Sequence, residues 1–183
     1  MQALSNAELL SLLAAARAHS ERDFLMILVA YCHGLRASEV VSIVRDDIKD
    51  GRLEVRRLKG SEHTEQSLHQ DQNPLLNERQ ALFDFASNFE GNQKLFPLTR
   101  RQFGRIVSRH AITVGLPEHK RHPHMLKHTI GAEIYEKTKD LRLVRTRLGH
   151  KRESSSLIYA GRVAERAADA QVESLIGSRS LIL

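Results

Sequence analysis

The sequence predicts an α+β fold that is mainly α with a small three-stranded antiparallel sheet. Apolar residues recur at helical spacing before residue 45 and again after residue 77. Between them, residues 46–70 change to an alternation of apolar and charged side chains, which is typical of half-buried strands. A length of 183 residues with 41% hydrophobic residues suits a single domain, 1–183, with a substantial core.

The first part of the chain is expected to form three helices. Ser5 and Glu8 have the spacing of a capping box, which begins a helix that runs to about residue 18. A second helix is expected over Glu21–Cys32 and ends at Gly34, because glycine readily adopts the left-handed conformation at a helix C-terminus. A shorter helix is expected over Ala37–Val44.

The sheet is expected to follow directly. Asp46–Gly51 indicates a short strand and a turn, and Arg52–Leu58 alternates as a half-buried strand should. Residues 59–61, Lys-Gly-Ser, form the next turn, and Thr64–His69 is expected to return as the third strand, although few of its residues are apolar.

The remainder is expected to be helical. One helix begins near Asn77, ends at Gly91, and has an apolar face of Leu82, Phe83, Phe85 and Phe89. A basic loop over Pro117–Pro123 precedes the helix that carries His124, since proline suits a first helical turn. The other expected helices are Thr99–Gly115, Leu141–Leu148 closed by Gly149, one around Tyr159, and Val163 to about Ile176.

The charge pattern indicates a nucleic-acid partner. The net charge is +6 and the pI is about 9.8, which favours a polyanion, although an ordinary basic surface gives the same totals. Lysine and arginine concentrate at 52–59, 100–109, 120–127 and 142–152, beside the polar motifs. Aromatic residues are few and tryptophan is absent, which argues against a stacking single-strand binder. Double-stranded DNA is therefore the expected partner.

The sequence also favours a cytoplasmic, nucleoid-associated location and no membrane contact. It has no apolar run of about 18 residues, and its N-terminus lacks the pattern of a signal peptide. The single cysteine, Cys32, lies among apolar residues and is interpreted as buried filler in a reducing compartment.

Two motifs far apart in the chain indicate chemistry on a phosphodiester. The first reads His33-Gly34-Leu35-Arg36-Ala37-Ser38-Glu39, and the second begins His122-Pro123-His124-Met125-Leu126-Lys127-His128 and continues to Leu148-Gly149-His150 and Tyr159. Arginine presents a planar fork that bridges two phosphate oxygens, and preplaced cations stabilise a charged transition state without a metal. Tyrosine is a nucleophile once charges and hydrogen bonds assist it, since its ordinary pKa is about 10.

In this order and spacing, the motifs resemble the catalytic domain of the tyrosine recombinases, also called the phage integrase family. The wording around His124 is most similar to the small recombinases that invert fimbrial promoter switches. The resemblance implies strand cleavage and rejoining through a covalent 3′-phosphotyrosyl intermediate, without cofactor, metal or ATP. The residues that it implies are catalytic Arg36, Lys59, His124, Lys127, His150 and Tyr159, with Glu39 orienting Arg36.

Each of these residues also has an ordinary structural interpretation. Taken alone, Arg36 suits a surface ion pair, His150 a helix-terminal cation, Tyr159 a core position and Lys59 a turn. Lys127 departs from the family pattern, which usually has arginine there, because lysine is a point donor without a fork. A metal site at His122, His124 and His128 is disfavoured, since no glutamate or cysteine accompanies them.

The resemblance implies a homo-oligomer, a tetramer on paired sites, with possible DNA-bending accessory proteins. The N-terminal DNA-clamp domain of most members is expected to be absent, and the apolar residues 173–183 dock either on their own chain or on a neighbouring protomer. Two other functions stay open. One is a type IB topoisomerase-like nicking and closing activity, and the other is a non-catalytic, regulatory DNA-binding protein with the same fold.

Overall fold

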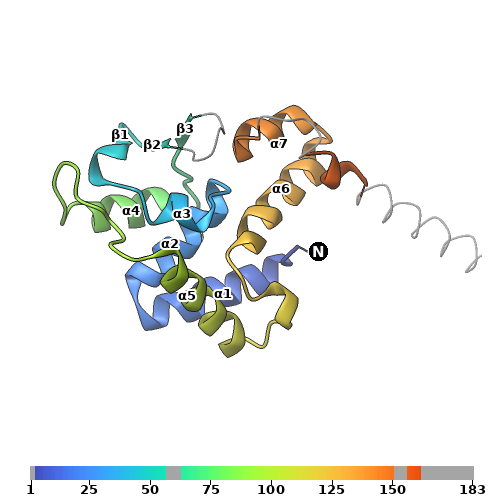
Figure 1. The fold of residues 1–183 in the computed structure, drawn as a ribbon, viewed down its shortest axis with the longest axis horizontal. Helices are drawn as coiled ribbons and strands as arrows, with labels where there is room; N and C mark the ends of the chain where they lie inside the picture. Colours follow the sequence, from blue (N-terminus) through green and yellow to red (C-terminus); the bar gives the residue numbers. More distant parts are fainter. Residues whose placement is uncertain (1–2, 57–62, 151–155, 162–183) are drawn as a thin grey trace, which may run out of the picture.

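The computed structural model describes residues 3–56, 63–150 and 156–161 and confirms a mainly helical chain with one small sheet (Figure 1). The elements in chain order are α1 Asn6–His19, α2 Glu21–Cys32, α3 Ala37–Val40, η1 Arg45–Asp47, β1 Ile48–Lys49, β2 Arg52–Val55, β3 Thr64–Ser67, α4 Glu78–Ala86, α5 Arg100–Thr113, η2 Glu118–Lys120, α6 His124–Thr138 and α7 Leu141–Leu148. Residues 156–161 are also helical. The predicted turn at 59–61, the predicted helix at 163–176 and the tail at 173–183 lie outside the described residues.

The core is built around α2. Every residue from Phe24 to Ala30 is fully buried, because α1, α4, α5 and α6 all pack against this helix. A helix that is apolar all round is stable only when it is enclosed in this way. Cys32 is buried at its end, as the sequence predicted.

The predicted caps are present. The Ser5 hydroxyl accepts a hydrogen bond from Glu8 N at 3.2 Å, and Glu8 accepts one from Ser5 N at 2.7 Å, which completes the capping box of α1. Gly34 follows α2 with φ of 58°, and Gly149 follows α7 with φ of 64°, so both glycines adopt the left-handed conformation.

The sheet is antiparallel with strand order β1-β2-β3. Leu53 pairs with Gln66, and these two side chains share the buried face, whereas Arg52 and Glu54 point outward. β3 lies beside α7, so the sheet is joined to the C-terminal part of the described chain (Figure 1).

A second, smaller apolar cluster lies beside the main core. Val144 and Leu148 of α7 and Tyr159 are buried together against partly buried side chains of α6, among them Ile130 and Ile134. The helical residues 156–161 therefore lie against α6 and α7, as Figure 1 shows.

Several predicted boundaries were wrong. The helix predicted over 37–44 ends at Val40, where the Ser42 hydroxyl donates to the carbonyl of Glu39 at 2.7 Å. Residues 45–47 form a 3₁₀ turn instead of a strand, and the Asp47 carboxylate accepts from Val44 N at 3.0 Å. Side chains that bond nearby backbone groups end regular structure in this way. The third strand ends at Ser67 instead of His69.

The helix predicted over 77–91 is also shorter. It ends at Ala86, because the Ser87 hydroxyl and the Asn88 amide donate to the carbonyl of Asp84 at 2.7 Å and 3.3 Å. Of the predicted apolar face, Leu82, Phe85 and Phe89 pack against the core, whereas Phe83 is 62% exposed.

No helix among the described residues has both the length and the apolar content that crossing a bilayer requires.

Replacing Gly34 with alanine is expected to destabilise the protein by about 2–4 kcal/mol, because two costs add: a left-handed backbone and overpacking. A Cβ at this position would lie 2.3 Å from Leu148 Cδ2. Gly115→Ala is the matched control, since Gly115 has φ of 71° but nothing within 4 Å of its added Cβ. Urea denaturation of both variants measures the difference. Equal losses would show that the Leu148 contact contributes nothing.

Candidate active site

Arg36 is positioned by the start of α3. It is the N-cap residue, and Glu39 accepts a hydrogen bond from Arg36 N at 2.7 Å and from Arg36 Nη1 at 2.9 Å. The Glu39 side chain is 1% exposed, whereas that of Arg36 is 40% exposed. One buried carboxylate therefore fixes both the backbone and the guanidinium of Arg36, which is the arrangement that an orienting role for Glu39 requires.

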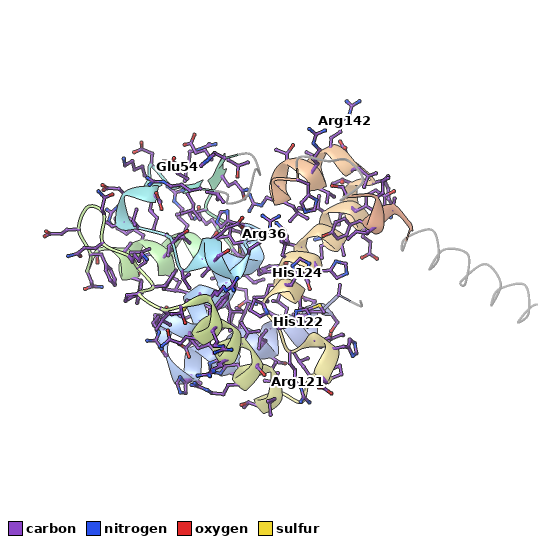
Figure 2. All side chains as sticks on the ribbon, viewed as in Figure 1. Arg36, Glu54, Arg121, His122, His124 and Arg142 are labelled. Carbon is purple, nitrogen blue, oxygen red and sulfur yellow. The ribbon has the colours of Figure 1, made fainter. Side chains whose placement is uncertain are left out.

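Arg36 and His124 line the same open groove. Figure 2 shows Arg36, His124 and His122 on one part of the molecule, where α3 and the start of α6 face each other. The groove has a volume of about 940 Å³ and is lined by Arg36, Ala37, Ser38, Arg100, Arg101, Gly104, His122, Pro123 and His124. This set holds three arginines and two histidines and no carboxylate, so the groove attracts an anion.

The electrostatics of the groove act on His124. Desolvation, together with the positive charges of Lys127, His122 and Arg36, lowers the pKa of His124 below its ordinary value. At neutral pH the imidazole is therefore uncharged and has a lone pair that accepts a proton. A phosphate group bound beside it would supply negative charge and raise the pKa again.

The pH dependence of DNA binding follows from this shift. Because a bound phosphate raises the pKa of His124, DNA binding is expected to take up a proton and to tighten as pH falls from about 7.5 to 6. DNA affinity, measured by fluorescence anisotropy over this pH range, should depend less steeply on pH in His124→Gln than in the wild type. For the free protein the sign is opposite: the lowered pKa gives a stability contribution that is present above about 6.5 and is lost as pH falls below it. If DNA affinity depended on pH in the same way in the wild type and in His124→Gln, this expectation would be contradicted.

Lys127 lies behind the groove. Its side chain is 2% exposed, and Nζ donates to the carbonyl of Gly34 at 2.6 Å and to the carbonyl of Leu148 at 2.8 Å. We call residues 34–36 the Arg36 loop and residues 148–150 the His150 turn. Lys127 therefore ties the Arg36 loop to the His150 turn through two buried backbone carbonyls.

His150 is held by the C-terminal end of α7. Its backbone N donates to the carbonyl of Arg145 at 3.0 Å, and Arg145 Nε donates to the carbonyl of His150 at 3.1 Å. The ring atom Nδ1 lies 3.1 Å from the hydroxyl of buried Ser156. The contact with Ser156 therefore fixes the orientation of the His150 ring through Nδ1.

Tyr159 is 4% exposed and packs on α6. Its ring stacks on His128 with centroids 5.4 Å apart and planes inclined by 28°. A Cβ on Gly131 would lie 2.7 Å from Tyr159 Cζ and 2.8 Å from its hydroxyl oxygen, so glycine is needed for this close approach. Leu157 and Ile158 are exposed, so Ser156 and Tyr159 form the buried side of this turn.

The structure thus brings most of the predicted site residues into one region. Arg36 and His124 share the groove, Lys127 joins the Arg36 loop to the His150 turn, and Tyr159 packs beside α7. Lys59 lies outside the described residues. The groove also contains Arg100, Arg101 and His122, which were not predicted as catalytic residues; the signal for them was the clustering of basic residues at 100–109 and 120–127.

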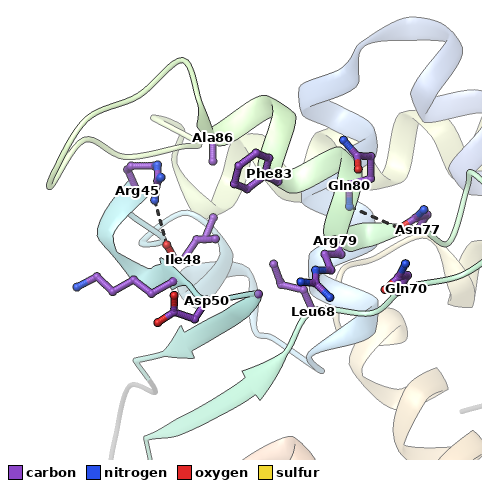
Figure 3. A pocket seen from close by; sticks show the side chains of 12 residues that line it. Arg45, Ile48, Asp50, Leu68, Gln70, Asn77, Arg79, Gln80, Phe83 and Ala86 are labelled. Carbon is purple, nitrogen blue, oxygen red and sulfur yellow. Dashed lines mark hydrogen bonds between the residues drawn. The ribbon is translucent and has the colours of Figure 1, made fainter.

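A second cavity of about 1020 Å³ lies between the sheet and α4 (Figure 3). Its wall includes Arg45, whose Nη1 donates to the carbonyl of Ile48 at 2.9 Å, and exposed Phe83. It contains none of the described candidate catalytic residues. The groove at Arg36 is therefore the candidate site.

Comparison with known proteins identifies the family of this chain. The model of the phage integrase family matches residues 2–166. The type 1 fimbriae regulatory protein FimE of Escherichia coli K12 is 32% identical over 161 residues, which cover 80% of this chain and 78% of FimE. FimB of the same strain is 33% identical over 179 residues, covering 89% of this chain and 86% of FimB. The tyrosine recombinase XerD of Bradyrhizobium diazoefficiens is 32% identical, and the match covers 82% of this chain and 51% of XerD.

Solved structures show the same fold. XerA recombinase has a TM-score of 0.73 at 19% identity, covering 87% of this chain and 60% of XerA. XerH bound to its difH substrate has a TM-score of 0.69 at 23% identity, covering 92% of this chain and 52% of XerH. The lambda integrase catalytic core has a TM-score of 0.64 at 21% identity, covering 83% of this chain and 93% of the catalytic core. With the family match over most of its length and relatives above 30% identity, the chain belongs to the phage integrase family of tyrosine recombinases.

Proposed function

We propose that this protein is a site-specific DNA recombinase that cleaves and rejoins strands through a covalent 3′-phosphotyrosyl intermediate. The observation that carries the proposal is the groove at Arg36 and His124, which is cationic and is tied by Lys127 to the His150 turn. Such a site binds a phosphodiester and stabilises the negative charge of its transition state with fixed donors. Neither a metal nor ATP enters the proposed reaction, since the energy of the cleaved bond is kept in the phosphotyrosyl ester.

In the proposed reaction, Arg36 bridges two non-bridging oxygens of the scissile phosphate through its planar fork. His150 donates a further hydrogen bond to this phosphate. Lys127 lies behind these groups and adds positive charge while it holds the two loops that carry them. Glu39 keeps the guanidinium oriented through its contact at 2.9 Å.

The covalent step exchanges one phosphate ester for another. A bond forms between the Tyr159 phenolic oxygen and phosphorus while the bond from phosphorus to the 5′-oxygen breaks. The neutral form of His124, which desolvation and neighbouring positive charges favour, accepts the phenol proton, so cleavage requires the DNA-bound protein in which His124 has not taken up a proton. Lys59 gives a proton to the departing 5′-oxygen. Attack by a 5′-hydroxyl on the phosphotyrosyl ester then rejoins the strand and frees Tyr159.

The proposed partners are double-stranded DNA and further copies of this chain. Solved relatives include XerH with its difH substrate and a lambda integrase tetramer on a Holliday junction. Leu157 and Ile158 are 51% and 52% exposed beside Tyr159, which supports contact with another protomer at this turn. We propose a tetramer on paired sites, assisted by DNA-bending proteins, in the nucleoid.

The test uses a nicked suicide duplex, because loss of the short product strand traps the covalent intermediate. The target sequence is first selected by binding from a random duplex pool. Denaturing gel electrophoresis is expected to show a DNA-linked protein band that forms without divalent metal or ATP and weakens strongly in Arg36→Ala. Tight binding with no band from the wild type would reject the proposal.

A non-catalytic, DNA-binding role is the second candidate, and the burial of Lys127 favours it. With Nζ directed to two backbone carbonyls, this side chain does not present the arginine fork that the family usually has. The suicide duplex separates the two candidates, since only a recombinase forms the band. Relaxation of supercoiled plasmid that lacks the selected site would instead indicate a type IB topoisomerase-like activity.

A further inference from the structure

Behind the groove, a buried polar cluster joins α2, β3, α4 and α7. It consists of His33, Gln66, Glu78 and Arg147, and we call it the His33 cluster. The side chains of His33 and Glu78 are 0% exposed, and Gln66 is 6% exposed. Buried polar groups of this kind are stable only when their hydrogen bonds are satisfied. None of the four lines the groove, so the cluster has no direct access to a bound phosphate.

The contacts of Gln66 fix the direction of its amide. Its Nε2 donates to Thr64 Oγ1 at 2.9 Å and to the carbonyl of Arg147 at 3.0 Å. Because a carbonyl only accepts, the nitrogen must be on that side, and Gln66 Oε1 faces His33 Nδ1 at 2.9 Å. His33 Nδ1 is therefore the donor of this hydrogen bond.

The other ring nitrogen of His33 faces a carboxylate. His33 Nε2 lies 2.8 Å from Glu78 Oε1, and Glu78 Oε2 accepts from His69 N at 2.9 Å. Each nitrogen of the imidazole therefore faces an oxygen atom of a neighbouring side chain. Glu78 is the first residue of α4, where the helix dipole favours a negative charge. His33 is thus enclosed between Gln66 of β3 and Glu78 of α4.

Arg147 closes the cluster into a ring. Its guanidinium donates to the carbonyl of Cys32 through Nε at 2.8 Å and also through Nη2. Cys32 precedes His33 in the chain, and the carbonyl of Arg147 is the group that Gln66 holds. The ring thus joins the residues directly before the Arg36 loop to the residue directly before the His150 turn, through the third strand of the sheet.

We propose that His33, enclosed between Gln66 and Glu78, is a positioning residue that holds the Arg36 loop and the His150 turn in one fixed arrangement. Its catalytic consequence rests on the proposed recombinase function, whereas the positioning itself is a property of the fold. Lys127 ties the two loops through the carbonyls of Gly34 and Leu148, and the His33 cluster ties the residues directly before the two loops. Two separate ties resist both translation and rotation of the loops.

The test variants are Gln66→Met, which keeps the side-chain length but removes the amide, and Glu78→Gln, which removes the charge. His110→Gln is the matched control. His110 Nε2 lies 3.2 Å from Asp23 Oδ2 in a second buried histidine–carboxylate pair, near the start of α2 and away from the Arg36 loop. Melting temperatures are compared first, so that variants of equal stability are assayed well below unfolding.

The first readout is NMR of the ring and guanidinium nitrogens, which needs no activity. His33 signals, assigned by their loss in His33→Gln, are expected to show a proton on Nδ1, as its hydrogen bond to Gln66 Oε1 requires. Gln66→Met should shift the Arg36 Nε and His150 ring signals, whereas His110→Gln should not. Unmoved Arg36 and His150 signals in Gln66→Met would overturn the proposal, as would a His33 ring without a proton on Nδ1 in the wild type.

The second readout is the single-turnover rate of adduct formation at saturating protein. Gln66→Met is expected to lower this rate by about 10- to 100-fold, because small displacements of catalytic groups have effects of this size. DNA affinity should stay within about threefold, since the outer phosphate contacts are untouched. An equal fall in rate for His110→Gln at equal stability would show a merely structural role. If the wild type forms no adduct, the recombinase function fails, and the NMR result still decides the positioning.

Discussion

Tyr159→Phe is expected to lower formation of the covalent adduct by at least about 10³-fold, because no other group replaces a missing nucleophile. DNA binding is expected to change by less than about threefold, since phenylalanine differs only by the hydroxyl. The ring should keep its stacking on His128 and its close packing at Gly131, so the fold is preserved. The suicide duplex measures the adduct, and fluorescence anisotropy measures affinity on the same DNA.

Tyr135→Phe is the matched control, because Tyr135 packs in the same apolar cluster. It should form the adduct at the wild-type rate. If Tyr159→Phe still formed the adduct, another residue would be the nucleophile. Normal adduct formation combined with a loss of stability in Tyr159→Phe would mean that the phenol hydroxyl is structural.

The helices were predictable from sequence because their signals are local. The capping box at Ser5 and Glu8, and the glycines after α2 and α7, act within one helical turn, so spacing alone locates them. The ends of α3 and α4 were less predictable. They depend on whether Ser42 and Ser87 bond a backbone carbonyl or solvent, and the residue type does not determine that choice.

The sequence named Arg36 and His124, which the structure places in one groove, but it gave no sign that Lys127 is buried. Nothing local distinguishes Lys127 from an exposed helical lysine, and its burial depends on Gly34 and Leu148, which are far away in sequence. Gln66 is a similar case. It made the third strand look polar, yet it lies on the buried face because His33 and the carbonyl of Arg147 satisfy its amide. Apolar periodicity does not detect a face that is buried through hydrogen bonds.

Lys127→Met is expected to lower adduct formation by at least about 100-fold, because the Arg36 loop and the His150 turn lose the tie between them. Two buried carbonyls, of Gly34 and Leu148, would lose the donor at 2.6 Å and 2.8 Å. Methionine matches the apolar stem of lysine, so the change removes the charge and the donors with little change in packing. The stability loss is expected to be about 2–4 kcal/mol. Urea denaturation and the suicide duplex measure the two effects.

Lys127→Arg then separates the two roles of this side chain. A guanidinium has five donors, enough to keep the carbonyl contacts, and it adds the planar fork that bridges phosphate oxygens. Because Lys127 Nζ is directed to backbone carbonyls, we expect its main role to be the tie, so Lys127→Arg should cleave within about threefold of wild type. A rise of about tenfold or more would instead show that the phosphate lacks a donor in this protein. In that case lysine at this position would itself limit the reaction, and wild-type cleavage would depend more heavily on Arg36 and His150.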